Sequence, residues 1–136
     1  MSDLHHDAIV TRLKEHVQLA SSVYELGEVP TFPTGSTPRY VVLASSPGDW
    51  EQARVTGGKV ALRTTETLYC VGASQSAARK VATWVETQMK DHRLTVAGRN
   101  VFKPDPWLSR PAQIDKDGII KLPFVTIQFD VYSEPA

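Results

Sequence analysis

The stretch at residues 72–76, GASQS, is the first candidate for chemistry, because an apolar strand-like run ends at Gly72 and a helical hydrophobic pattern follows. A phosphate cradle needs several glycines, so that backbone N–H groups can close on the anion, and usually a following lysine. A nucleophile elbow needs a serine between two glycines, a setting that neither Ser74 nor Ser76 has. Serine is a preferred helix N-cap. We therefore interpret GASQS as a hinge whose Ser74 or Ser76 caps the helix.

Histidines and carboxylates are the next candidates, and their spacing does not indicate a site. No two of the four histidines have the i, i+4 spacing of a helical metal site. Asp3, His6 and Asp7 could gather at a helix start, where the helix dipole favours acids. Asp115 and Asp117 lie in a turn-like KDG sequence. We expect no catalytic residues, no metal site and no cofactor.

The alternative hypothesis, that the chain is an enzyme, depends on one spatial arrangement. Ser74, His92 and an acid would have to converge within hydrogen-bonding reach in the folded chain. That arrangement would favour a small ligand-binding or hydrolytic domain over a protein whose activity is contact with other proteins.

Length and composition indicate one soluble globular domain over residues 1–136. The chain has 15 basic and 15 acidic residues, so its zero net charge gives no whole-chain attraction to nucleic acid. Cys70, which lies in a strand-like run, is expected to be a small buried apolar residue. No apolar run approaches the roughly 20 residues that span a bilayer, and the first residues do not resemble a signal peptide. We expect a protein made and folded in the cytoplasm.

Two segments have helical hydrophobic spacing. In the first, an apolar stripe runs from Leu4 to Ala20 and includes Ile9, Leu13 and Val17, and the helix is expected to end at Ser21 and Ser22. The second follows GASQS. Its stripe consists of Ala77, Ala78, Val81, Val85 and Met89.

The rest of the chain is predicted to form strands and long loops. The predicted strands are 23–26, 40–44, 60–71, 94–96, 100–102 and 125–132. The strand at 40–44 should be central, the polar middle of 60–71 could project beyond the sheet, and 94–96 and 100–102 should form a hairpin. The predicted loops are 27–38, 45–58 and 103–118. Most connections between the strands are too short for crossover helices, so we predict an α+β fold with a mostly antiparallel sheet covered on one face by two amphipathic helices.

Two tryptophans lie outside any periodic core pattern. Trp50 and Trp107 each lie in a long polar loop, where they either fold back as anchors or contact another protein. Tryptophan and arginine are enriched at binding hot spots. Arg54, Arg99 and Arg110 lie in or beside loops and turns and are further candidates for a protein interface.

The order and spacing of six segments resemble the tail terminator proteins of long-tailed bacteriophages, also called minor tail or tail completion proteins. The segments are VYELGEVP, PRYVVLASSPGDW, LYCVGASQSAARKVATWVE, LTVAGRNVF, QIDKDG and FVTIQFDVYSEP. They span nearly the whole chain, and the strand-to-helix step CVGAS is similar to that of actinobacteriophage members. The loop from Pro30 to Pro38 departs from the family pattern in its length.

The resemblance implies a structural virion protein and not an enzyme. Copies would form a closed ring, usually a hexamer, that caps the tail tube, ends tail polymerisation and joins the tail to the head connector. The expected partners are further copies, the tail tube protein and the head-closure protein, with assembly in the host cytoplasm and no membrane. DNA would pass through the lumen without sequence readout, near Lys59, Arg63 or Arg54. The alternative within this class is another neck protein, a head-closure or connector component.

Overall fold

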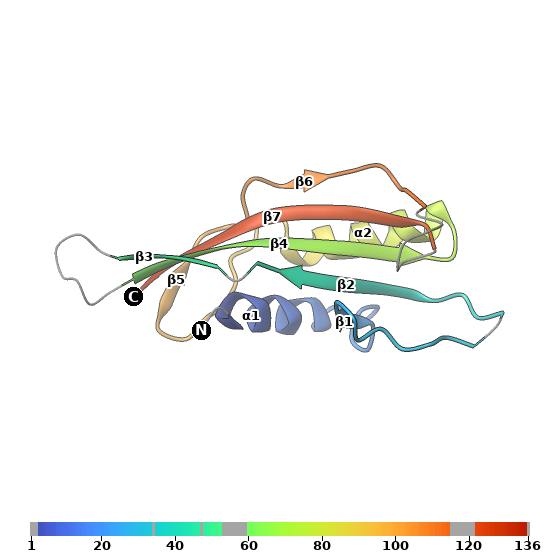
Figure 1. Cartoon of the computed structure of the whole chain (residues 1–136), viewed down its shortest axis with the longest axis horizontal. Coiled ribbons are helices and arrows are strands. Elements are labelled where there is room, and N and C mark those ends of the chain that lie inside the picture. Colours follow the sequence, from blue (N-terminus) through green and yellow to red (C-terminus); the bar gives the residue numbers. More distant parts are fainter. Residues whose placement is uncertain (1–2, 34, 47, 53–59, 115–121, 136) are drawn as a thin grey trace.

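The computed structural model describes residues 3–33, 35–46, 48–52, 60–114 and 122–135. Within these ranges the chain forms two helices and seven strands (Figure 1). In chain order they are α1 (Asp3–Lys14), β1 (Val23–Glu25), β2 (Arg39–Ser45), β3 (Asp49–Gln52), β4 (Val60–Gly72), α2 (Gln75–Met89), β5 (Arg99–Val101), β6 (Leu108–Ser109) and β7 (Phe124–Pro135). No helix in the described ranges is long and apolar enough to cross a membrane.

All seven strands belong to one sheet, whose main order is β1-β2-β4-β7-β5. The two longest strands, β4 and β7, pair antiparallel from Leu62 opposite Ser133 to Val71 opposite Phe124. The short strand β3 pairs with β4, and β6 pairs with β7. Only the pairing of β1 with β2 is parallel among the described strands. The predicted α+β fold with a mostly antiparallel sheet is confirmed.

Both helices contribute to the main core on one face of the sheet. Alternate residues of β7 from Val125 to Val131 are buried there, as the period-2 pattern predicted. They pack with Leu68 and Cys70 of β4, with Ile9 and Leu13 of α1, and with the predicted stripe of α2 from Ala78 onwards. Figure 1 shows α2 behind β4 and β7, and α1 along β2 and β1. Full burial stabilises each Leu, Ile or Val side chain by about 1.5–3 kcal/mol, so the two helices are fixed mainly by this core.

A smaller apolar cluster covers one end of the opposite sheet face. Tyr40, Val42 and Val71 are buried there under side chains that include Phe32 and Phe124. Phe32 stacks on Tyr40 with a centroid separation of 5.1 Å. Because β2 has apolar residues on both faces and lies between β1 and β4, its predicted central position is confirmed.

The hinge interpretation of GASQS is also confirmed. Ser74 is the N-cap of α2, and its Oγ accepts a hydrogen bond from the backbone N–H of Ala77 at 3.1 Å. A Cβ at Gly72 would lie 2.5 Å from the backbone nitrogen of Ala78 and 2.6 Å from the carbonyl carbon of Ala77. The glycine is therefore needed because the end of β4 passes directly against the first turn of α2.

The first helix is shorter than predicted and turns a different face to the core. It ends at Lys14, and turns follow. Leu4 is 38% exposed and Val17 is 83% exposed, so neither belongs to the buried stripe. The buried face consists of His5, Ile9 and Leu13, which follow one another at i+4 spacing. His5 can occupy a core position because both of its ring nitrogens are hydrogen-bonded.

Four strand predictions were wrong in detail. The predicted loop 45–58 contains β3, and the predicted loop 103–118 contains β6. Residues 94–96 form no strand, and β5 pairs with β7 and not with a hairpin partner. The polar middle of β4 does not project from the sheet, because residues 63–67 pair with β7 and Thr64 and Glu66 are buried. Hydrogen bonds to neighbouring side chains make this burial of polar groups possible.

Candidate functional site

The interface residues predicted from the sequence do not gather at one place in the described part of the chain. Arg54 and Lys59 lie outside the described residues, and of Trp50 only the backbone, in β3, is described. Arg63 lies on β4, Arg99 begins β5, and Trp107 and Arg110 flank β6. The role of this set in contacts with other proteins stays a prediction.

Trp107 packs towards the core. Its ring stacks on Phe129 of β7 with a centroid separation of 5.0 Å and an interplanar angle of 2°. This is the position of a loop anchor, which holds the segment around β6 against the edge of the sheet. Arg110, three residues further on, is exposed, and its backbone N–H donates to the carbonyl oxygen of Thr126 at 3.0 Å.

Arg99 also has a role inside the fold. Its Nε–H donates to Oγ of Ser133 at 2.8 Å, and its Nη2 donates to the carbonyl oxygen of Ser133 at 3.0 Å. Ser133 is fully buried on β7. The guanidinium group therefore joins β5 to β7 and supplies a proton donor to a buried hydroxyl group.

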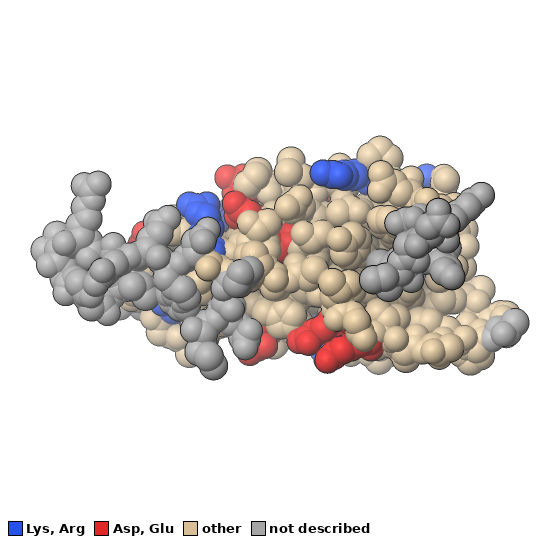
Figure 2. Space-filling view, viewed as in Figure 1, with Lys and Arg blue, Asp and Glu red and all other residues tan. Residues whose placement is uncertain are grey.

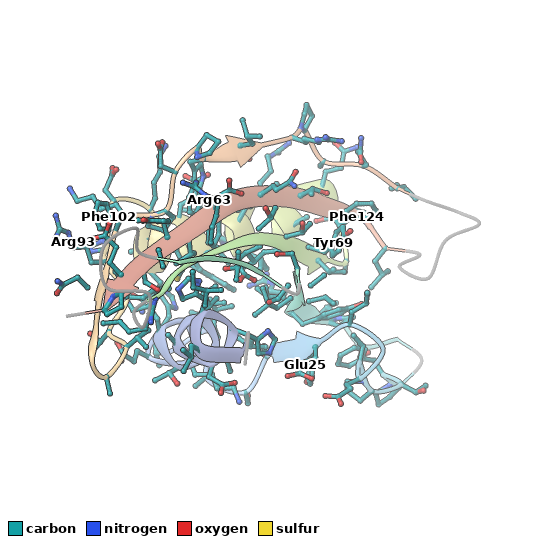
Figure 3. All side chains as sticks on the ribbon, turned by 60° about the vertical axis from the view of Figure 1, so that its left-hand side comes forward. Glu25, Arg63, Tyr69, Arg93, Phe102 and Phe124 are labelled. Carbon is teal, nitrogen blue, oxygen red and sulfur yellow. The ribbon has the colours of Figure 1, made fainter. Side chains whose placement is uncertain are left out.

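Arg63 lies in an open groove of about 630 Å³ at one end of the sheet. Its guanidinium carbon is 5.0 Å from the ring centroid of Tyr132, and its Nη1 is 3.9 Å from Oδ2 of Asp130. Figure 3 shows Arg63, Phe102 and Arg93 towards one end of the molecule, and Tyr69 with Phe124 towards the other. The charged lining residues of the groove are Arg63, Arg93, Lys103, Asp91, Asp105 and Asp130. With three residues of each sign, the groove has no excess positive charge to attract phosphate.

Two hydrogen-bonded clusters between α1 and the sheet were missed by the sequence analysis. The first, the His6 cluster, consists of His6, Ser45, Glu25 and Glu66. The Nδ1 of His6 is 2.8 Å from Oγ of Ser45, and its Nε2 is 2.7 Å from Oε1 of Glu25. The hydroxyl group of Ser45 donates a short hydrogen bond to Oε2 of Glu66. The cluster joins α1 to β1, β2 and β4.

The second, the His5 cluster, consists of His5, Thr64, Ser133 and Arg99. The Nδ1 of His5 is 2.9 Å from Oγ1 of Thr64, and its Nε2 is 2.7 Å from Oγ of Ser133. Burial, together with the positive charge of Arg99, lowers the pKa of His5 from 6.5 to about 4. His5 is therefore neutral at pH 7. This cluster joins α1 to β4, β7 and β5.

Glu66 is the buried carboxyl group of the His6 cluster. Burial raises its pKa, and hydrogen bonds from Ser45 and Thr64 and the charge of His6 offset part of that shift. Its Oε1 is buried and has no hydrogen-bond partner among the described residues. A signal in the sequence could have indicated these residues: Thr64, Glu66 and Ser133 all fall on the inward positions of their strands.

The His6 cluster has the residue types of a serine–histidine–acid triad but not its proton arrangement. A nucleophilic serine must donate its proton to the histidine. Here the Ser45 hydroxyl group donates to Glu66, so His6 Nδ1 acts as the donor to Ser45. Ser74 and His92 lie at opposite ends of α2, roughly 20 Å apart for a helix of this length. The condition set for the enzyme reading, their convergence, is not met.

Metal binding finds no support in the described ranges. No group of three or more His, Cys, Asp or Glu side chains there is arranged to hold a metal ion. Cys70 is buried, and burial raises the pKa of its thiol, so it is a core residue and not a reactive one.

Comparison with known proteins identifies the fold. No protein-family model and no curated protein matches the sequence. Among solved structures, the chain is similar to one described as "Virion of native gene transfer agent (GTA) particle", with a TM-score of 0.57 and 19% sequence identity. The similarity covers 94% of this chain and 92% of that chain. At this identity, the two chains share a fold over nearly their whole lengths.

Proposed function

We propose that the chain is a structural virion protein and a tail terminator. In this proposal its copies form a hexameric ring that caps the tail tube, ends tube polymerisation and joins the tail to the head connector. The observation that carries the proposal is the fold shared with a chain of a gene transfer agent virion over 94% of this chain. The resemblance of six ordered segments to tail terminators narrows the class to this role.

The surface of the subunit is suited to head-to-tail contacts. A closed ring needs two different patches on each subunit, related by a rotation that closes. Leu26 after β1 and Leu108 on β6 are more than half exposed and lie near the two sides of the sheet. Figure 2 shows mostly uncharged side chains over the middle of one face, with acidic groups along the edge where α1 and β1 lie. Such a surface and a net charge of zero permit self-association.

DNA would pass through the lumen of the ring without sequence readout. Arg63 is the described residue that we assign to this surface, together with Arg54 and Lys59. Because Asp130 lies beside Arg63 and the groove is balanced in charge, contacts to phosphate would be weak and sensitive to salt. Weak contacts suit a channel that DNA must leave.

Two alternatives are less well supported. Head-closure proteins tend towards small β-barrels, whereas this chain has an open sheet with two helices on one face. A hydrolytic domain would need a nucleophile whose proton passes to a histidine, but Ser45, the exposed hydroxyl group beside His6, donates its proton to Glu66. The geometry therefore favours a role in assembly without chemistry.

The test is the mass of the purified chain in solution, with negative-stain microscopy of the same sample and of a mixture with tail tubes. We expect rings, alone at high concentration or at the ends of the tubes. Tubes of uniform length in the presence of the chain, and of variable length in its absence, would support termination. A protein that stays monomeric at all concentrations and does not bind tube ends would contradict the proposal.

A further inference from the structure

Two neighbouring histidines on α1 lie in opposite electrostatic surroundings. His6 faces Glu25 of β1, Ser45 of β2 and the carboxyl group of Glu66 on β4. His5 faces Thr64 of β4, Ser133 of β7 and the cationic Arg99 of β5. The surroundings of His5 therefore oppose a positive charge on its ring, whereas His6 lies beside carboxyl groups.

The hydrogen bonds around His5 fix where its proton lies. Oγ of Ser133 already accepts the Nε–H of Arg99, which leaves the Ser133 hydroxyl proton to be donated to Nε2 of His5. The Nδ1–H of His5 then donates to Oγ1 of Thr64, whose hydroxyl proton is available to Glu66. The chain of donors runs in one direction, from Arg99 to Glu66, and requires a neutral His5.

A second proton on His5 breaks this chain. Both ring nitrogens would then be donors, and Ser133 would receive protons from His5 and from Arg99 while its own hydroxyl proton lost its acceptor. The imidazolium would also be fully buried beside a guanidinium group. The hydrogen-bond partners of His5 are the hydroxyl groups of Thr64 and Ser133, and no carboxyl group in the described ranges is bonded to its ring. The charged form must therefore leave the pocket.

The attachment of the first turn of α1 depends on this cluster more than on apolar packing. Leu4 is 38% exposed, whereas Ile9 and Leu13, one and two turns later, are fully buried. The rest of the helix is thus held by the core, and the first turn is held by His5 and His6. Opening of this turn requires the loss of a few hydrogen bonds and not the unfolding of the core.

We propose that His5 makes the N-terminal turn of α1 an acid-releasable contact: protonation of its ring detaches this turn from β4 and β7, while α2 and the sheet stay folded. The device would loosen α1 from the three strands that the His5 cluster joins to it: β4, β5 and β7. It is independent of the proposed role in a virion.

The test is amide hydrogen exchange of the full chain between pH 7 and pH 4, expressed as protection factors, which correct for the intrinsic pH dependence of exchange. We expect the protection of the amides at residues 7–9 of α1, which donate to carbonyl oxygens of the first turn, to fall relative to α2 roughly tenfold for each pH unit between pH 6 and pH 4. In a His5→Gln variant, whose side chain does not titrate, the ratio should stay constant. His92→Gln, a substitution of an exposed histidine, is the matched control and should behave as the unmodified chain does.

Equal loss of protection in α1 and α2 would overturn the proposal, because it would indicate global unfolding. An unchanged response in His5→Gln would overturn it as well. Should that variant fail to fold, NMR titration of the unmodified chain provides the second test. The ring signals of His5 should then titrate near pH 4, together with the loss of α1 protection. A midpoint near 6.5 without any change in α1 would contradict the proposal.

Discussion

Glu66 shows how the surroundings of one residue can set a pH dependence for the whole fold. It is fully buried on the inward face of β4, where burial raises the pKa of its carboxyl group. A group whose pKa is raised by folding contributes stability that is complete below its unfolded pKa and is lost as the pH rises through its folded pKa. For Glu66, this loss begins above about pH 4.5, the ordinary value.

A Glu66→Gln substitution removes this dependence, because the carboxamide does not ionise and can still accept the hydrogen bond from Ser45. We expect the variant to gain free energy of unfolding relative to the unmodified chain as the pH rises from 5 to 8. Urea unfolding at several pH values measures the difference. His5 loses its stabilising contribution in the opposite direction, as the pH falls from 6.5 through about 4. This contribution of His5 is the same in both proteins, so it cancels in the difference between their free energies of unfolding. A difference that is flat or falls with pH would show that folding does not raise the pKa of Glu66.

At the scale of elements, the junction of β4 and α2 depends on two small residues, and the first is the cap. Ser74→Ala removes the acceptor of the Ala77 N–H, and we expect the free energy of unfolding to fall by about 1 kcal/mol. Ser76→Ala is the matched control, because Ser76 is exposed in the first turn and alanine favours a helix. Chemical denaturation measures both. Equal effects of the two substitutions would contradict the assignment of the cap.

The second is the glycine at the close approach. Gly72→Ala places a methyl group 2.5–2.7 Å from backbone and side-chain atoms of Ala77 and Ala78, contacts that require β4 and α2 to move apart. We expect a loss of about 1–3 kcal/mol, the usual range for overpacking of a core. Thermal unfolding followed by circular dichroism measures it. A melting temperature equal to that of the unmodified chain would contradict this, because it would show that β4 and α2 can move apart without a loss of stability.

The sequence predicts those elements whose hydrophobic pattern continues over several periods. β7 and α2 are long, alternate or repeat regularly, and were predicted with their buried residues. β3 and β6, with four and two residues, are too short for periodicity to detect, and their pairing depends on β4 and β7 as templates. The two clusters were missed because their buried members, such as His5 and Glu66, count as polar in any pattern. Their partners are 59 or more residues away for His5 and 21 for Glu66–Ser45, and only the fold brings them together.

At the scale of the whole molecule, substitutions of two arginines from the predicted interface set distinguish an effect on folding from an effect on assembly. Arg99→Ala removes hydrogen bonds to buried Ser133, so we expect a loss of about 1–3 kcal/mol in the free energy of unfolding. Arg110→Glu changes an exposed residue beside β6, and we expect stability within about 0.5 kcal/mol of the unmodified chain.

We expect the Arg110→Glu substitution to affect ring formation more than it affects stability. Arg110→Glu is expected to reduce the ring population measured by analytical ultracentrifugation, because it reverses a charge at the sheet edge that we assign to the subunit contact. The purified subunit must first be shown to be folded by circular dichroism. Rings that form equally well with glutamate at this position would remove Arg110 from the contact surface.

The central pairing of β4 with β7 also determines when the core can be completed during biosynthesis. β4 leaves the ribosome about halfway through the described chain, whereas β7 is the last of the described elements to be made. Until β7 is made, α2 and β4 lack the packing partners that complete their core, which are Val125, Ile127, Phe129 and Val131. Nascent chains therefore have no finished subunit surface to present to one another. In the proposed ring, contacts through this surface would form only after β7 has been made.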